Sequence, residues 1–186
     1  AVIHTRSVDE VLWLLTDDII VDLGFEDCVV YLLDEDRGKL VQKAAYGNKK
    51  AGPTEILDPI EIDVSQGITG RCATEQRPIL VNDVTQDPAY VLDDIQRMSE
   101  LAVPIVSEGR TIGVIDSEHS EKNFYTEQHL VTLRALSAII TTKYENERAL
   151  KGLEASQRRL QHLVNHASFD VEKRYPGDRG TKLVGS

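Results

Sequence analysis

Hairpin turns, rather than helical crossovers, connect most of the strands that this sequence predicts. The clearest pair consists of the apolar segments 101–106 and 111–116, which flank the turn Ser107-Glu108-Gly109-Arg110. A turn this short joins antiparallel strands, whereas parallel strands need a crossover of about a dozen residues or more. A second pair, 28–33 and 40–46, is joined by a short polar turn in the same way. The chain is therefore predicted to build an antiparallel sheet.

Amphipathic helices are predicted at both ends of the strand region. The first begins at the capping box Ser7-Val8-Asp9-Glu10 and ends before Gly24. The second begins near Thr126, where apolar residues start to recur at three- and four-residue steps. Short helices are expected over 71–76 and 90–98. This order predicts an α+β fold in which the terminal helices pack on one face of a central antiparallel sheet, while short helices and loops cover a ligand pocket on the other.

Composition limits the partners and the location of the chain. Its 186 residues include 31 acidic and 21 basic side chains, which give a net charge of -10. Such a chain repels phosphate backbones, so nucleic acid is not an expected partner. The longest apolar runs are strand-sized, and no membrane span is predicted. Two cysteines, Cys28 and Cys72, and the lack of a signal-peptide pattern predict a cytoplasmic location.

Glycine, aspartate and proline residues predict local structure around the sheet. Gly67 and Gly70 allow a tight turn into a helix, and the exposed amides of that turn can hold an anion or a carbonyl group. A turn without a ligand is the alternative. Asp83 and Asp87 are expected to close Asx turns. Pro104 lacks a donor for the strand ladder, so its strand is expected at a sheet edge or with a bulge.

Several sequence blocks, in order and with matching spacing, resemble the GAF sensory domain. They lie at 67–70, 77–84, 87–90, 99–105, 109–115 and 124–130. The resemblance covers about residues 5–145 and implies a GAF/PAS-like domain with a regulatory pocket for a small molecule, in proteins that usually form parallel dimers. It predicts a sensory domain of a bacterial-type signal-transduction protein, in which pocket occupancy changes the packing of dimer helices and thereby an output domain that follows.

The ligand of such a pocket is not identified by the sequence, and no cofactor can be named. Cyclic-nucleotide-binding GAF domains carry a signature near the last strand of which only Phe124 is present, and bilin-binding members carry a Cys-His pair where Cys72 is followed by Ala73. His162 and His166 have metal-binding spacing on a helix, but no third ligand is near in sequence, so no metal site is predicted.

Six residues on segments expected near the pocket are candidate ligand contacts. Arg97 can clamp a carboxylate or a phosphate; the alternative is a surface arginine that pairs with Asp93 or Asp94. The polar residues at the end of the strand 111–116 can face the cavity or simply meet water. The full set is Cys72, Tyr90, Arg97, Met98, Asp116 and Ser117.

Free methionine-R-sulfoxide reductases are GAF enzymes that use cysteine chemistry, and Gly70-Arg71-Cys72-Ala73 resembles a segment that carries one of their cysteines. Where that family's nucleophile is expected, this chain has Tyr90-Val91-Leu92-Asp93-Asp94. Without that thiol no sulfenic intermediate forms there. The chain is therefore predicted not to be an enzyme. A thiol-dependent reductase and a ligand-free structural dimerisation module remain the alternatives.

The C-terminal helix is predicted to form a dimeric coiled coil over residues 146–167. Leucines and other apolar residues alternate at three- and four-residue steps, with Lys143, Asn146 and Gln157 at the polar seam positions. A lone solvated helix is the alternative. Beyond residue 167 the pattern stops, so 168–186 is expected to be disordered, part of a neighbouring domain, or vector-derived. The predicted dimerisation residues are Leu136, Ile139, Leu150, Leu153, Leu160 and Val164.

Overall fold

A computed structural model describes residues 7–92 and 95–174 of the chain. It divides into two compact units, with the boundary between Glu145 and Asn146. The first unit holds the sheet and most of the helices, and the second consists of the remainder of the terminal helix. Among the described residues, no helix combines the length and the apolar character that a bilayer crossing requires.

The first unit is built on a six-stranded sheet with the order β5-β2-β1-β8-β7-β6, and every neighbouring pair in it is antiparallel. This confirms the antiparallel sheet predicted from the hairpin turns. A smaller two-stranded sheet pairs β3 with β4. The strands are β1 (Asp27–Asp34), β2 (Lys39–Gly47), β3 (Lys50–Gly52), β4 (Glu55–Ile56), β5 (Glu61–Asp63), β6 (Ile79–Val81), β7 (Ser99–Ser107) and β8 (Arg110–His119).

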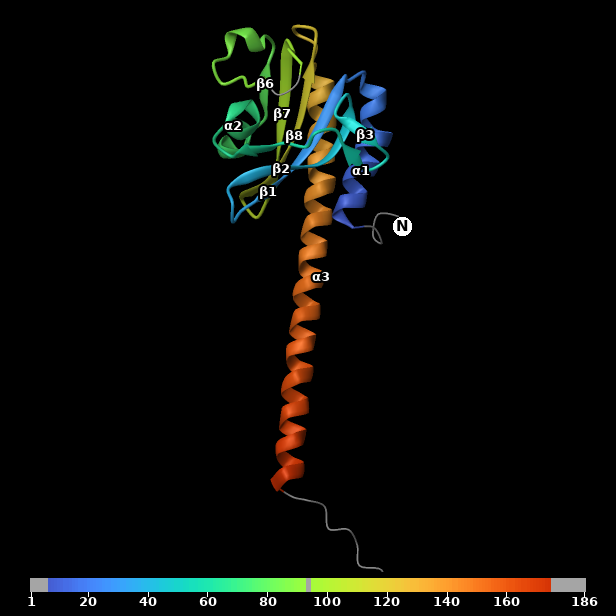
Figure 1. The fold of residues 1–186 in the computed structure, drawn as a ribbon, viewed down its shortest axis with the longest axis vertical. Coiled ribbons are helices and arrows are strands. Elements are labelled where there is room, and N and C mark those ends of the chain that lie inside the picture. Colours follow the sequence, from blue (N-terminus) through green and yellow to red (C-terminus); the bar gives the residue numbers. More distant parts are fainter. Residues whose placement is uncertain (1–6, 93–94, 175–186) are drawn as a thin grey trace, which may run out of the picture. The chain divides into compact units, whose positions relative to one another are not determined.

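The two long helices cover one face of the sheet, as predicted (Figure 1). Helix α1 (Val8–Asp18) begins at the predicted capping box, in which Ser7 and Glu10 exchange hydrogen bonds, and a short 3-10 helix, η2 (Ile20–Leu23), leads to Gly24 with a left-handed backbone. The beginning of α3 (Glu127–Arg174) packs beside α1 on the same core. Buried residues of this face include Leu12, Val30, Val103, Ile115 and Leu133.

Helix α2 (Gly67–Glu75) covers the opposite face (Figure 1). Its Ile68 and Cys72 pack with Val29, Tyr31 and Val114 in a second buried cluster. Val29 and Tyr31 alternate along β1 with Val30, which lies in the other cluster, as the two-residue period of a strand requires. The sheet is thus buried on both sides, and the predicted division between terminal helices and short helices is confirmed.

Two local predictions differ from the structure. A hydrogen-bonded turn does lead from β5 into α2, and Gly67 has a positive φ of 72° there, but the helix begins at Gly67, four residues earlier than predicted, so that Gly70 lies in its first turn. A Cβ on Gly70 would lie 2.9 Å from the carbonyl oxygen of Asp63, so close helix packing explains this glycine. The short helix expected over 90–98 is absent from the described part of that range; the only helical turn nearby is η3 (Val84–Gln86), and residues 93–94 lie outside the described residues.

The hairpin between β7 and β8 has the turn that its sequence predicts. Glu108 and Gly109 both have positive φ, of 49° and 74°, as a type I′ turn requires. Pro104 is not on an edge strand, because β7 lies between β8 and β6. Strand β6, however, pairs with β7 only as far as Ala102, and the β7–β8 register shifts between Ile105 and Val106. Pro104 therefore lies beyond the part of β7 that pairs with β6 and next to the irregularity in the β7–β8 pairing.

In the second unit the terminal helix continues from Asn146 to Arg174, seven residues past the predicted end of the coiled coil; residues 175–186 lie outside the described part. Leu150, Leu153, Leu160 and Val164 are exposed on it, each by more than half. Leu136, by contrast, is buried in the core of the first unit, and Ile139 packs against that core. The structure thus contains a terminal helix, while the coiled coil and the dimer stay predictions.

Candidate functional site

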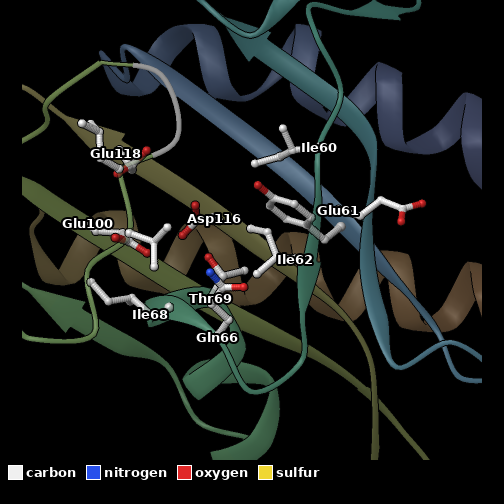
Figure 2. A pocket seen from close by; sticks show the side chains of 13 residues that line it. Ile60, Glu61, Ile62, Gln66, Ile68, Thr69, Glu100, Asp116 and Glu118 are labelled. Carbon is white, nitrogen blue, oxygen red and sulfur yellow. The ribbon is translucent and has the colours of Figure 1, made fainter.

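A cavity of about 270 Å³ lies between the sheet and the segments that cover its α2 face (Figure 2). We call it the acidic pocket. Strands β1, β7 and β8 form its floor, and β5, the start of α2, Val91 and Leu92 surround it. Its lining residues are Tyr31, Ile60, Glu61, Ile62, Gln66, Gly67, Ile68, Thr69, Val91, Leu92, Glu100, Asp116 and Glu118.

Three carboxylates of β7 and β8 line one wall of the acidic pocket. Glu100 lies directly opposite Glu118 in the β7–β8 register, and Asp116 is two residues before Glu118 on the same face. Directly opposed residues have Cβ atoms about 5 Å apart. The residue opposite Asp116 is Ala102, whose small side chain leaves room above the strand. All three acids are less than one-tenth exposed. Their burial concentrates negative charge in a region of low dielectric constant.

The N-terminal end of α2 forms another wall. Gln66 is the N-cap residue, and no side chain caps this end of the helix. Gly67, Ile68 and Thr69 make up the first turn and line the acidic pocket. The first amides of a helix have no partner within the helix, and the helix dipole adds partial positive charge there. The pocket therefore has a negative wall on the strands and a positive end at α2.

A hydrogen-bonded group on β1 and β2 completes the pocket. Gln42 on β2 is only 6% exposed; its Nε2 lies 3.0 Å from Tyr31 Oη, and its Oε1 accepts a hydrogen bond of 3.1 Å from the backbone N–H of Ile60. Ile60 and Ile62 contribute apolar surface on this side (Figure 2). The side chain of Gln42 thus connects Tyr31, in the floor of the pocket, to the segment that leads into β5.

Glu61 touches the rim of the pocket but does not belong to its negative wall. Its side chain points away from the cavity (Figure 2) and forms a two-pronged ion pair with Arg37. That ion pair lowers the pKa of Glu61, because the guanidinium stabilises the ionised carboxylate. Substitution of Glu61 is therefore a matched control for substitution of Glu100, Asp116 or Glu118 in the pocket wall.

Of the six predicted ligand contacts, Asp116 lines the acidic pocket. Ser117, the next residue on β8, is turned toward the other face, where its Oγ donates to the Asp27 carbonyl and accepts from Tyr125 Oη. Met98 is held by its backbone, since its N–H donates to the carbonyl of His119. None of the other five predicted contacts belongs to the lining of this cavity. A ligand contact by any of the six stays a prediction.

The two cysteines are buried on opposite faces of the sheet. Cys28 packs with the terminal helices, and Cys72 packs on the α2 face. Burial raises the pKa of both thiols, and the negative charge of Asp116 raises both further. A thiolate at either position is therefore disfavoured, and the sheet separates the two sulfur atoms.

Arg97 is a buried anchor rather than a surface residue. Its guanidinium pairs with Glu26 at 2.6 Å and with Asp27 at 3.1 Å, and its backbone N–H donates to Tyr90 Oη. The alternative partners considered from the sequence, Asp93 and Asp94, lie outside the described residues. Burial raises the pKa of Tyr90, and the nearby Glu118 raises it further. Arg97 thus fixes the chain where it enters β7, two residues before Ser99.

The two predicted Asx turns are present. Asp83 Oδ1 accepts from the N–H of Thr85, and Asp87 Oδ1 accepts from the N–H of Ala89. Asp87 also pairs with Arg71 of α2 at 2.7 Å, which ties the following segment to the helix. Among the described residues, no group of three or more His, Cys, Asp and Glu side chains is arranged to hold a metal ion.

The GAF domain family matches residues 5–142, about three quarters of the chain. The chain belongs to the GAF domain family. A curated relative, the free methionine-R-sulfoxide reductase of Saccharomyces cerevisiae, is 38% identical over 71 residues, which make up 34% of this chain and 39% of the relative. The chain thus spans about two fifths of that relative's length.

Solved structures share the fold. A free methionine-R-sulfoxide reductase from Neisseria meningitidis, in complex with its substrate, has a TM-score of 0.71 and 23% identity, with 80% of this chain and 85% of that chain covered. The GAF domain of an Acinetobacter phosphoenolpyruvate-protein phosphotransferase has a TM-score of 0.69 and 19% identity, with 79% and 88% covered. At these identities the likeness concerns the fold alone.

The relatives correct one prediction. The chain was expected not to be an enzyme, because the position of the reductase nucleophile carries no cysteine. That expectation is contradicted, since a reductase is 38% identical to part of this chain and another reductase shares its fold. Enzymatic activity is therefore considered below together with ligand sensing.

We expect Arg97→Met to destabilise the first unit by about 3 kcal/mol, because it leaves the buried Asp27 carboxylate without its cation. Urea unfolding at pH 7, followed by circular dichroism, measures the change. Arg77→Met is the control: Arg77 is exposed and pairs with Glu75 at the surface, so a change below about 0.5 kcal/mol is expected. Equal effects of the two substitutions would contradict the anchoring role of Arg97.

Proposed function

We propose that this GAF domain binds a small zwitterionic metabolite, of the free amino acid class, in the acidic pocket. The observation that carries the proposal is the polarity of the cavity, in which three strand carboxylates face the uncapped N-terminal end of α2. An ammonium group suits the carboxylates, and a carboxylate group suits the helix amides. The volume of about 270 Å³ is at the small end of ligand pockets, which favours a metabolite over a nucleotide.

Strand β7 lines the pocket and also bonds to the terminal helix, which supports a sensory role in signal transduction. Strand β7 carries Glu100 in the pocket, and its later residues accept hydrogen bonds from α3: Ser137 Oγ donates to the Pro104 carbonyl, and Thr141 Oγ1 donates to the Val106 carbonyl. A ligand that prefers one arrangement of β7 thereby biases α3. A differential affinity of about 1 to 3 kcal/mol is enough for useful coupling.

In this proposal the chain is a cytoplasmic homodimer, and α3 passes the signal to an output domain. The exposed leucines at 150, 153 and 160 supply an apolar stripe for a parallel partner helix. The matching GAF domain of the Acinetobacter phosphotransferase, which is part of a larger protein, is in keeping with this arrangement.

A second candidate function is the thiol-dependent reduction of free methionine-R-sulfoxide. The partial identity to the yeast reductase favours it, and Cys72 packs on the same face of the sheet as the acidic pocket, although it does not line the cavity. In that reaction Cys72 would attack the sulfoxide sulfur, release methionine and become a sulfenic acid. An external thiol would then form a mixed disulfide with it and release water, and a second external thiol would restore Cys72. Cys28 cannot replace the external thiol, because it lies on the opposite face of the sheet from Cys72.

We expect Glu100→Gln to weaken the binding of an L-amino acid about tenfold or more, because it replaces a charge-assisted hydrogen bond to the ammonium group with a neutral one. Isothermal titration calorimetry with L-methionine and L-methionine sulfoxide measures the effect. Glu61→Gln serves as the control, since Glu61 pairs with Arg37 outside the cavity. It should change the affinity less than about twofold. If the two variants bind alike, the strand carboxylates are not the ammonium site.

The reductase candidate predicts turnover of free methionine sulfoxide with excess dithiothreitol, lost in Cys72→Ser and kept in Cys28→Ala. The rate should rise steeply with pH, because burial and the nearby carboxylates raise the pKa of Cys72 and leave little thiolate at neutral pH. Methionine release, followed by chromatography, is the measurement. An absence of turnover, or equal turnover in Cys72→Ser, would remove this candidate and leave the binding proposal intact.

A further inference from the structure

A threonine in the first turn of α2 has a buried hydroxyl group without a protein partner. Thr69 is only 5% exposed and lines the acidic pocket (Figure 2). Within the part of the chain that the structure describes, its Oγ1 makes no hydrogen bond, and this oxygen is not completely covered by protein atoms. Most buried polar atoms are hydrogen-bonded, because burial without a partner costs free energy. The Thr69 hydroxyl therefore has a bonding capacity that the folded chain does not use.

Thr74, one turn later in α2, shows how a threonine is satisfied inside this helix. Its Oγ1 lies 2.9 Å from the carbonyl oxygen of Gly70 and 3.0 Å from that of Val64. A threonine hydroxyl in a helix commonly donates in this way to the carbonyl four residues earlier. For Thr69 that residue is Ser65, which precedes the helix, and no such bond is present among the described residues. The hydroxyl of Thr69 is thus left for a group in the pocket.

Backbone N–H groups at the same end of α2 are also without acceptors in the helix. The N–H of Gly70 donates to the carbonyl of Gln66 at 3.0 Å and is the first donor of the helical ladder. The N–H groups of Ile68 and Thr69 come before it, so the helix itself offers them no acceptor. Both residues line the acidic pocket, and no side chain caps this helix end. Two amides and one hydroxyl therefore supply three donors on a single wall.

We infer that Thr69 Oγ1 and the N–H groups of Ile68 and Thr69 hold the free carboxylate of the ligand, so that the site takes amino acids and discriminates against their amides. This inference rests on the proposed function and makes Thr69 a specificity-determining residue. A carboxylate only accepts hydrogen bonds, on two oxygens, and so matches three donors. A carboxamide has one oxygen, and its NH2 meets backbone N–H groups that cannot accept. The positive end of the helix dipole also favours the anion.

L-methionine and L-methioninamide test the inference, because they differ only in this group. Calorimetric titration at a pH where both ammonium groups are protonated gives the two affinities. We expect the wild-type chain to bind L-methionine about tenfold or more tightly than the amide. Thr69→Val, which keeps the shape of the side chain, should weaken L-methionine about tenfold or more and the amide only about two- to fivefold, because a charge-assisted bond is lost in the first case and a neutral bond in the second.

Thr69→Ser is the matched control, because it keeps the hydroxyl and removes only the methyl group. It should retain the wild-type preference for L-methionine over the amide. Thr74→Val removes a hydroxyl from the same helix outside the pocket and should also leave the preference unchanged. A preference that survives undiminished in Thr69→Val, or that Thr69→Ser loses equally, would overturn the inference.

Thermal unfolding without ligand shows whether the hydroxyl has a structural role instead. Thr74→Val breaks a bond to a backbone carbonyl and should lower the melting temperature. Thr69→Val breaks none in the described structure, so it should leave the melting temperature unchanged or raise it. An equal loss of stability in the two variants would assign the Thr69 hydroxyl to the fold and contradict the carboxylate site.

Propionate separates this inference from the proposed function, because it carries a carboxylate and no ammonium group. In nuclear magnetic resonance spectra of the backbone amides, added propionate should shift the signals of Ile68 and Thr69 in the wild type and in Thr69→Ser, but not in Thr69→Val. If these shifts occur and neither methionine compound binds, the amino acid function fails while the carboxylate site stands. If L-methionine binds and propionate leaves both signals unchanged, the carboxylate site fails while the amino acid function stands. If no probe binds, both fail.

Discussion

The pairing register of β7 and β8 places two glutamates directly across from each other, and the acidic pocket depends on this arrangement. Like charges in opposed positions of a sheet repel, and burial strengthens the repulsion. Glu100 and Glu118 nevertheless lie on the covered face, with Asp116 beside them. In the proposed function, the ammonium group of a bound ligand reduces that repulsion. The same register leaves Ser117 on the other face, where it bonds to Asp27 and Tyr125, so one strand serves both the pocket and the helix side.

Much of the fold follows from local sequence signals, since each acts over a few residues. The capping box at Ser7 and the turn at Glu108-Gly109 contain their own hydrogen-bond partners and backbone requirements, so both form as expected. The start of α2 and the irregular chain after Asp87 were not predicted correctly. Gly70 is explained by the approach of α2 to β5, and the segment after Asp87 is held by Arg71 and Arg97. Contacts between distant segments of this kind leave no periodic pattern in the sequence.

The candidate site was only partly predictable for the same reason. Asp116 was identified because it ends an apolar strand, but Glu100 and Glu118 were not. The sequence does carry a signal for both glutamates. Each is an acidic residue within a largely buried strand, and each lies between residues that face the opposite side of the sheet. The orientation of Gln42 depends on Ile60, which is 18 residues away, and no spacing rule connects the two. Arg97 was identified as a candidate ligand contact, whereas its partners Glu26 and Asp27 are 70 or more residues away and make it an anchor.

In the proposed site, a positive group of the ligand lies against the carboxylates of β7 and β8. This placement is tested most directly by removing the charge from the ligand and leaving the protein unchanged. Calorimetric titration of the wild-type chain with the best-binding L-amino acid and with its N-acetyl derivative makes that comparison. We expect N-acetylation to weaken binding by about tenfold or more, because the neutral amide loses the charge-assisted bonds. Equal affinity for the two compounds would contradict it.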